Sequence, residues 1–227
     1  MYALEGCNIG ADMAAAIVEY IVSDITDDGL DQSEASSGAT YRCDMHVRLA
    51  DPDRDAADVS AIYRPSVENG LASFEEDAPD ADEMARRMRD TLARTPWLVA
   101  EDDSGAVVGY AYAGAHHERP GYRWAVNISV YVAEAARGQG VGRRLYDELL
   151  SILRRQGFVN VYAGITLPNP ASVALHEAIG MRRIGVYERV GFKLGAWHDV
   201  AWYGLRLTDP EGTPPEPIPL PDLSARG

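Results

Sequence analysis

The residues best suited to chemistry lie in one short run, residues 137–144, with the letters RGQGVGRR. Glycines let a backbone approach a ligand closely. A stretch of helical periodicity follows, so the first amides of a helix would point at whatever binds there. The positive end of the helix dipole favours an anion, typically a phosphate. Because three arginines also stand here on a chain of net charge −14, the run predicts a phosphate-binding loop.

Two familiar phosphate-binding loops do not match this run. A Walker loop requires Lys followed by Ser or Thr after its second glycine, and here Arg143 and Arg144 stand instead. A dinucleotide-binding fingerprint requires G-x-G-x-x-G after the first strand and an acidic residue about twenty positions later. The glycines here follow G-x-G-x-G, and four expected strands precede them. A tight turn that binds nothing is the third interpretation, and it would need neither three glycines nor three arginines.

The elements that must hold this loop follow from hydrophobic periodicity. Alternation predicts strands over residues 46–50, 97–100, 107–114, 124–132, 159–165, 183–192 and 197–207. Helical spacing and capping residues predict helices over residues 51–67, 82–92, 141–156 and 169–179. Pro65 is expected to bend or end the first of these helices. The resulting order, β-α-α-β-β-β-α-β-α-β-β, indicates an α/β (α+β) domain.

The chain is expected to divide into three parts. Residues 1–44 are interpreted as an N-terminal extension, in which a stretch with helical spacing precedes a flexible, acidic, Ser/Gly-rich linker. Residues 45–208 carry the packed α/β pattern. Residues 209–227 form a Pro-rich tail that cannot join a sheet and should be extended or disordered.

Composition narrows the classes of partner. A net charge of −14 argues against nucleic-acid binding, which requires a basic surface. No apolar run approaches the roughly 20 residues that span a bilayer, and the N-terminus lacks the basic region of a signal peptide. We therefore expect a cytoplasmic protein with no membrane partner. Lys193 is the only lysine, and this Asp-rich, Lys-poor, halophile-like composition fits a salt-rich cytoplasm or simply a GC-rich genome.

The cysteines point to no metal or disulfide framework. Cys7 and Cys43 are too few for a disulfide scaffold, and their spacing fits no zinc pattern. No metal is expected.

Several motifs together resemble a known family. The strand SVYV at 129–132 followed by R-x-x-G-x-G, within the order of elements above, resembles the GNAT superfamily of acetyl-CoA-dependent N-acetyltransferases. Within it, the chain is most similar to phosphinothricin and methionine sulfoximine N-acetyltransferases. The motifs that carry this similarity are PWLVAE at 96–101, AYAG at 111–114, SVYV at 129–132, LPN at 167–169, LHE at 175–177 and WHDV at 197–200.

The resemblance covers residues 46–207 and implies both a fold and an activity. The implied fold is a central, mixed but mostly antiparallel, twisted sheet of about seven strands, flanked by helices and splayed between the fourth and fifth strands. The implied activity is direct transfer of an acetyl group from acetyl-CoA, the cosubstrate, to the amine of a small amino-acid-like molecule.

The resemblance also assigns binding residues. The strand edge would pair with the pantetheine arm, and the glycine-rich loop would hold the pyrophosphate. The implied coenzyme-binding residues are Val130, Tyr131, Val132, Arg137, Gly138, Gln139, Gly140, Val141, Gly142, Arg143, Asn169 and Ser172. The implied substrate-binding residues are Phe74, Arg119, Tyr122, Asn127 and Ser129. The fork of Arg119 suits a carboxylate or phosphinate, although a solvated loop arginine is the plainer interpretation.

Three residues are implied in catalysis. Backbone amides near Tyr131 would polarise the thioester carbonyl. His176, in the LHE motif, would take a proton from the amine, although helical periodicity alone favours a packed histidine. The phosphinothricin enzymes carry a glutamate, proposed as general base, at the position of Asn127. A carboxamide accepts no proton, so His176, ordered water or a substrate that arrives as a free amine must replace that glutamate.

Other interpretations remain open at this stage. The chain could acetylate the N-terminus of a protein or peptide, which would require an open groove. It could also be a catalytically silent acyl-CoA-binding module, because Asn127 stands where the glutamate is expected. The Tyr/Trp-rich final strands suggest a homodimer by analogy with relatives.

Overall fold

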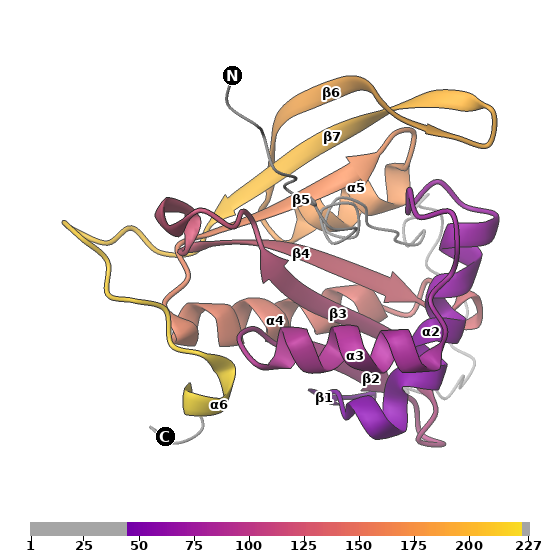
Figure 1. The fold of residues 1–227 in the computed structure, drawn as a ribbon, viewed down its shortest axis with the longest axis horizontal. Helices are drawn as coiled ribbons and strands as arrows, with labels where there is room; N and C mark the ends of the chain where they lie inside the picture. Colours follow the sequence, from indigo (N-terminus) through magenta and orange to yellow (C-terminus); the bar gives the residue numbers. More distant parts are fainter. Residues whose placement is uncertain (1–44, 224–227) are drawn as a thin grey trace, which may run out of the picture.

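The computed structural model describes residues 45–223, and its chain forms a seven-stranded sheet with helices on both faces (Figure 1). The predicted stretch of helix and linker in residues 1–44 lies outside the described residues. The strands are β1 His46–Leu49, β2 Trp97–Glu101, β3 Val107–Ala115, β4 Ala125–Val132, β5 Asn160–Thr166, β6 Arg182–Lys193 and β7 Ala196–Arg206. The helices are α2 Pro52–Glu68, α3 Ala81–Leu92, α4 Val141–Gln156, α5 Pro170–Ala178 and α6 Leu220–Leu223, with 3-10 turns η1 Pro120–Tyr122 and η2 Glu134–Ala136.

The strand order across the sheet is β1-β2-β3-β4-β5-β7-β6. Every neighbouring pair is antiparallel except β4 and β5, which run parallel. This mixed, mostly antiparallel sheet confirms the predicted fold class. β6 and β7 form a long hairpin at one end of the sheet (Figure 1).

The parallel pair is short, and this shapes the middle of the sheet. β5 pairs with β4 only from Ala125 to Asn127, whereas β5 pairs with β7 along its whole length from Asn160 to Thr166. The two strands therefore diverge after Asn127. The β5-facing side of Ile128–Val132 has no strand partner in the part of the chain that the structure describes, which is the splay predicted between the fourth and fifth strands.

Two hydrophobic clusters separate the faces of the sheet. α2 and α3 cover one face, where Val59, Met84 and Met88 pack against Tyr131 and its neighbours. α4 and α5 cover the other face, where Leu145 and Leu149 pack against alternate residues of β4. Because side chains alternate along a strand, Asn127, Ser129 and Tyr131 face α2 and α3. No helix within residues 45–223 is long and apolar enough to cross a membrane.

A close approach between β3 and α4 sets the position of that helix. A Cβ built on Gly109 would lie 2.9 Å from Val141 Cγ1 and 3.1 Å from the Tyr131 carbonyl oxygen. Both distances are shorter than ordinary van der Waals contact, so only glycine fits here. Gly109 thus allows the first residue of α4 to rest on the sheet beside the end of β4.

Two proline-containing segments, one within α2 and one in the C-terminal tail, have defined hydrogen bonds. α2 continues past Pro65 to Glu68, with the Asn69 amide donating to the Pro65 carbonyl, so the proline does not end the helix. The Pro-rich tail lies against the domain and has no regular structure up to residue 219, but the short helix α6 follows, so the described part of the tail is not extended throughout as predicted. Trp124 Nε1 donates to the Pro215 carbonyl at 2.8 Å, and Gln156 Nε2 donates to the Ile218 carbonyl at 2.8 Å.

A charged network fixes β1 and α2 to the edge of the sheet. Arg48 donates to both carboxyl oxygens of Asp55 at 2.7 Å and to Glu101 at 2.7 Å. Asp55 is 0% exposed and also accepts from the Asp51 amide. Burial opposes ionisation of Asp55, but the hydrogen bonds from Arg48 and Asp51 outweigh it, so the pKa of this carboxyl lies below its ordinary value.

We expect Asp55→Asn to lower the free energy of unfolding by about 1–3 kcal/mol, because Arg48 loses a charged partner in a buried setting. The folded pKa of Asp55 is lower than the unfolded one, so its stabilisation is complete above roughly pH 4 and is lost as the pH falls through the folded value. Urea denaturation between pH 3 and 7 measures both effects. Asp58→Asn, on the exposed side of α2, is the control and should change stability by less than about 0.5 kcal/mol. Equal effects of the two variants would contradict the assignment.

Candidate active site

The glycine-rich run forms the turn that opens α4. Gly138 and Gly140 have φ values of 82° and 77°, in the left-handed region that side chains disfavour. Gly140 is the N-cap residue and has no side chain to accept from the first amides of the helix. A 16-residue helix therefore begins with its positive end uncapped, as an anion-binding helix N-terminus requires.

The polar side chains of the run are held by local contacts. Gln139 donates to the Ala135 carbonyl at 3.0 Å. Arg143 pairs with Asp147 at 2.9 Å and donates to the Ala178 carbonyl at the end of α5. Both charged side chains of the Arg143–Asp147 pair are about half exposed, so their contact is worth little and can yield to a phosphate.

The predicted strand edge contributes backbone and not side chains. Val130, Tyr131 and Val132 are all buried. The Tyr131 ring stacks on Tyr110 with ring centroids 5.2 Å apart and meets Tyr63 edge-on. On this edge only main-chain groups can meet a ligand, on the side where β5 has diverged.

The start of α5 lies beside the same opening. Asn169 caps the helix by accepting from the Ser172 amide at 3.1 Å. Ser172 is 0% exposed, and its hydroxyl lies 3.3 Å from His176 Nδ1. The structure thus directs the Ser172 side chain at His176, while Asn169 remains partly exposed.

His176 is packed between α5, α4 and β7. It is 0% exposed, its Nδ1 lies 2.7 Å from the Ser172 carbonyl oxygen, and its Nε2 lies 3.1 Å from the Tyr146 hydroxyl. Its ring also contacts the Tyr203 ring. The role of His176 as proton acceptor stays a prediction, and this geometry favours the packed histidine that helical periodicity had indicated.

Asn127 lies where the β4–β5 pairing ends, and its partner is a histidine. His116 Nδ1 lies 2.8 Å from Asn127 Oδ1. Rings from three other elements surround His116, with centroids at 4.5 Å for Tyr162, 5.9 Å for Tyr122 and 6.3 Å for Trp202. We call these three residues, together with His116, the aromatic cluster. Sequence reasoning gave His116 no role, although its position in the loop before β4 was a usable signal.

The aromatic cluster contains one buried indole N–H group, that of Trp202. Trp202 Nε1 is buried and has no hydrogen-bond partner in the described part of the chain. Buried donors are nearly always paired, with protein, water or ligand. Trp202 lies on the same side of the sheet as Asn127. An oxygen of a polar molecule bound here could therefore accept a hydrogen bond from Trp202 Nε1.

Phe74 lies at a different place from Asn127. It packs against the β6–β7 hairpin, so closely that a Cβ on Gly191 would lie 2.2 Å from its ring. The single lysine strengthens the same junction, because Lys193 Nζ donates to the Ser73 carbonyl at 2.5 Å. Burial lowers the pKa of Lys193. The loop between α2 and α3 is thus fastened to the hairpin.

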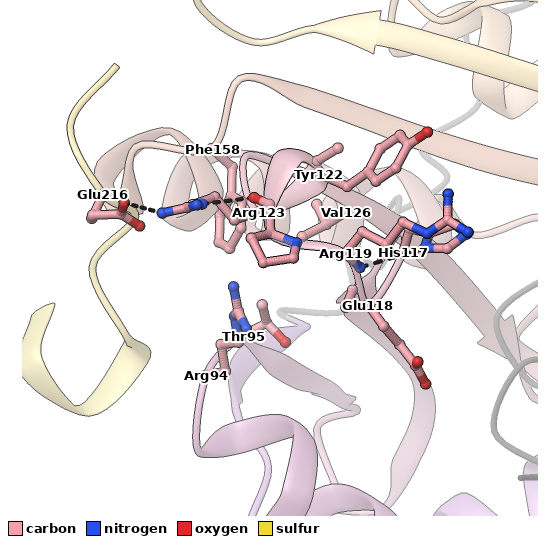
Figure 2. A pocket seen from close by; sticks show the side chains of 13 residues that line it. Arg94, Thr95, His117, Glu118, Arg119, Tyr122, Arg123, Val126, Phe158 and Glu216 are labelled. Carbon is pink, nitrogen blue, oxygen red and sulfur yellow. Dashed lines mark hydrogen bonds and ion pairs between the residues drawn. The ribbon is translucent and has the colours of Figure 1, made fainter. Parts of the chain in front are cut away.

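Arg119 and Tyr122 line a hollow of about 550 Å³ at the start of β4 (Figure 2). The Pro-rich tail closes one side, where Arg123 pairs with Glu216. Neither Asn127 nor Ser129 is among its lining residues. Of the predicted substrate residues, Tyr122 meets Asn127 through His116. Arg119 lies in the hollow, and Phe74 lies against the β6–β7 hairpin.

Comparison with known proteins gives the family. A model of the acetyltransferase (GNAT) domain matches residues 50–202. The chain belongs to the GNAT acetyltransferases. Phosphinothricin N-acetyltransferase of Streptomyces viridochromogenes is 38% identical over 72% of this chain and 88% of its own length. The L-methionine sulfoximine/L-methionine sulfone acetyltransferase of Salmonella typhimurium is 35% identical over 73% of this chain and 96% of its own.

Solved structures agree with this assignment. A GNAT phosphinothricin acetyltransferase from Sinorhizobium meliloti, in complex with acetyl-CoA, superposes with a TM-score of 0.69 at 38% identity. The match covers 74% of this chain and 93% of that one. A ribosomal-protein-alanine N-acetyltransferase from Brucella melitensis is also 38% identical, with a TM-score of 0.66, over 71% of this chain and 99% of that one. As a GNAT acetyltransferase, the chain is an acetyl-CoA-dependent acyltransferase.

We expect His176→Ala to act on stability and not on proton transfer. The loss of buried hydrogen bonds to Ser172 and Tyr146 should lower the free energy of unfolding by about 1–3 kcal/mol. The pH dependence of kcat in the folded variant should match the wild type. Thermal denaturation and a pH–rate series measure the two effects, with Glu177→Ala, exposed on the same helix, as the control. A stable variant that lost its dependence on pH would instead place His176 in the chemistry.

Proposed function

We propose that this enzyme transfers the acetyl group of acetyl-CoA to the α-amino group of a small amino-acid-like substrate of the phosphinothricin or methionine sulfoximine type. The observation that carries the proposal is the opening between β4 and β5 beside the uncapped start of α4. One ligand that joins a phosphate end to an extended arm with amide groups would fill both features.

Three features of the structure support the proposed binding of acetyl-CoA. The amides that follow Gly138 and Gly140 would hold the pyrophosphate, with Arg137 and Arg143 adding charge. The free side of Ile128–Val132 would pair with the pantetheine arm as a strand would. Asn169, at the start of α5, is partly exposed and would reach the acetyl-bearing end of the coenzyme. Acetyl-CoA supplies the activated acetyl group, and the protein supplies position and main-chain donors.

The substrate side rests on the aromatic cluster and on Asn127. Ring faces attract an ammonium group, and the buried indole N–H of Trp202 suits a carboxylate or phosphinate oxygen. Ser129 follows Asn127 on the same face. Two of the relatives above are named for amino-acid analogues as substrates, and these names support the same class of substrate for this enzyme.

The decisive experiment measures thiol release from acetyl-CoA with phosphinothricin, methionine sulfoximine, methionine sulfone and the free amino acids. We expect turnover with at least one amino-acid analogue, at a kcat/KM well above that for simple alkyl amines, because the carboxylate adds binding. Direct transfer also predicts sequential kinetics, with no acetyl group retained on the protein. Tight binding of acetyl-CoA without turnover on any amine would instead identify a silent binding module.

Acetylation of protein N-termini is the second candidate. The similarity to the ribosomal-protein-alanine N-acetyltransferase from Brucella melitensis favours it. An Ala-initiated peptide belongs in the same panel, because preference for that peptide over every free amino acid would favour this candidate and count against the first.

The turn before α4 gives a separate test of coenzyme binding. Gly140→Ala should raise the Kd for acetyl-CoA about tenfold, or about 1.4 kcal/mol, because a side chain disfavours its positive φ and the turn would redirect the first amides. Gly105→Ala is the matched control, since Gly105 has a φ of 80° and equally open surroundings in the β2–β3 turn. Both variants should lose about 1–2 kcal/mol of stability, but only Gly140→Ala should bind acetyl-CoA more weakly by calorimetry. Equal affinities would exclude this turn from the site.

Three broader expectations complete the proposal. We propose a homodimer formed through the β6–β7 hairpin, where most of the large exposed apolar side chains gather. They are Ile184, Tyr187, Val190, Phe192, Leu194 and Trp197. Apolar patches of this kind mark protein interfaces. The acidic, Lys-poor composition supports a cytoplasmic, salt-adapted protein that does not bind nucleic acids or membranes.

A further inference from the structure

The contact between His116 and Asn127 fixes the chemistry of both side chains. The His116 amide donates to the Ala125 carbonyl at 3.2 Å and holds the residue in line with β3. Its Nδ1 lies 2.8 Å from Asn127 Oδ1. With the Asn127 amide placed so that its oxygen faces Nδ1, that oxygen can only accept, so Nδ1 carries the hydrogen and Nε2 of a neutral ring keeps a lone pair. Asn127 thus sets the tautomer in which Nε2 is a proton acceptor.

Within residues 45–223, the acceptor nitrogen Nε2 of His116 takes part in no hydrogen bond. His116 is partly exposed, and the other rings of the aromatic cluster stand around it. Gly114, the β3 residue opposite Asn127, leaves room on the same side, because a Cβ there would meet no atom within 4 Å. An ammonium group can therefore approach Nε2 between ring faces.

The position along β4 also suits an amine about to react. Asn127 is the last β4 residue that pairs with β5, so the strand edge assigned to the acetyl-CoA arm begins directly after it. Ser129 and Tyr131 follow Asn127 on one face at two-residue spacing. The pair of side chains therefore stands at the point where the two strands diverge.

We propose that His116 is the general base of this acetyltransferase and that Asn127 is the residue that positions it. This inference rests on the proposed function. Nε2 takes one proton from the substrate ammonium, and the freed lone pair forms the C–N bond at the acetyl carbonyl carbon. The C–S bond then breaks, the thiolate takes the second proton from the nitrogen, and His116 returns its proton to solvent. Asn127 itself gains and loses nothing.

The first test compares His116→Gln with His46→Gln, an exposed histidine on β1 at the far edge of the sheet. We expect His116→Gln to lower kcat about 10²- to 10⁴-fold, the usual range for a lost general base. The Kd for acetyl-CoA and the Tm should stay at wild-type values. His46→Gln should match the wild type throughout.

The pH profile separates a base from a packing residue. Wild-type kcat should fall as the pH drops, because a protonated imidazole accepts nothing, and His116→Gln should lack this fall. The other titratable groups that face His116 are Tyr122 and Tyr162, while His117, Glu118 and Arg119 are the charged or titratable residues of the adjoining loop. In His116→Gly, added imidazole should restore part of the rate, which a structural role would not permit.

The positioning role is tested at Asn127. Asn127→Asp keeps an oxygen for Nδ1–H and should retain kcat within about tenfold of the wild type. Asn127→Leu removes that oxygen and should lose more than tenfold. If His116→Gln kept wild-type kcat and the same pH profile while the wild type acetylates an amino-acid analogue, the inference would be overturned and the proposed function would stand. If the wild type releases no thiol with any amine, both fail.

Discussion

The divergence of β4 from β5 after Asn127 is the constraint on which the rest of the structure depends. β5 pairs with β7 along its whole length on one edge, but on its other edge it pairs with only three residues of β4. Backbone groups that turn away from β3 on Ile128–Val132 must then find partners elsewhere, because buried amides and carbonyls are rarely left unpaired. A sheet that opens in its middle is tolerated when something extended completes it, and this is the place that we propose for the arm of acetyl-CoA.

Other features are arranged around the opening. The missing side chain of Gly109 lets α4 rest at the end of β4, and the left-handed turn at Gly140 starts the helix without a cap. On the opposite face of the sheet, alternation along β4 places Asn127 among aromatic rings from β5, β7 and the loop before β4. In the proposed enzyme, one strand would thus present its edge to the coenzyme and its face to the amine.

Much of this could be predicted from the sequence, because it depends on local patterns. Periodicity and capping residues gave all seven strands and the four long helices, and the glycine-rich run marked the start of α4. The splay between β4 and β5 was predicted only from the family resemblance, because hydrophobic periodicity does not indicate where two neighbouring strands diverge. The burial of His176 depends on Tyr146, thirty positions away on another helix. The contact of His116 with Asn127 depends on the register in which β4 pairs with β3 after the loop that connects them. Residue types alone do not determine that register.

An imidazole held by a carboxamide differs physically from a carboxylate at the same point. A carboxylate among aromatic rings would carry a charge at rest, and removing such a charge from water is costly without paired donors. The His116–Asn127 pair contains no carboxylate, so the proposed proton transfer from the amine requires no buried negative charge. Positive charge then passes from the ammonium to the imidazolium without leaving the ring faces of Tyr162 and Trp202, which attract a cation in either place. The cluster can thus hold the base in a poorly solvated site, because no isolated anion has to be buried there.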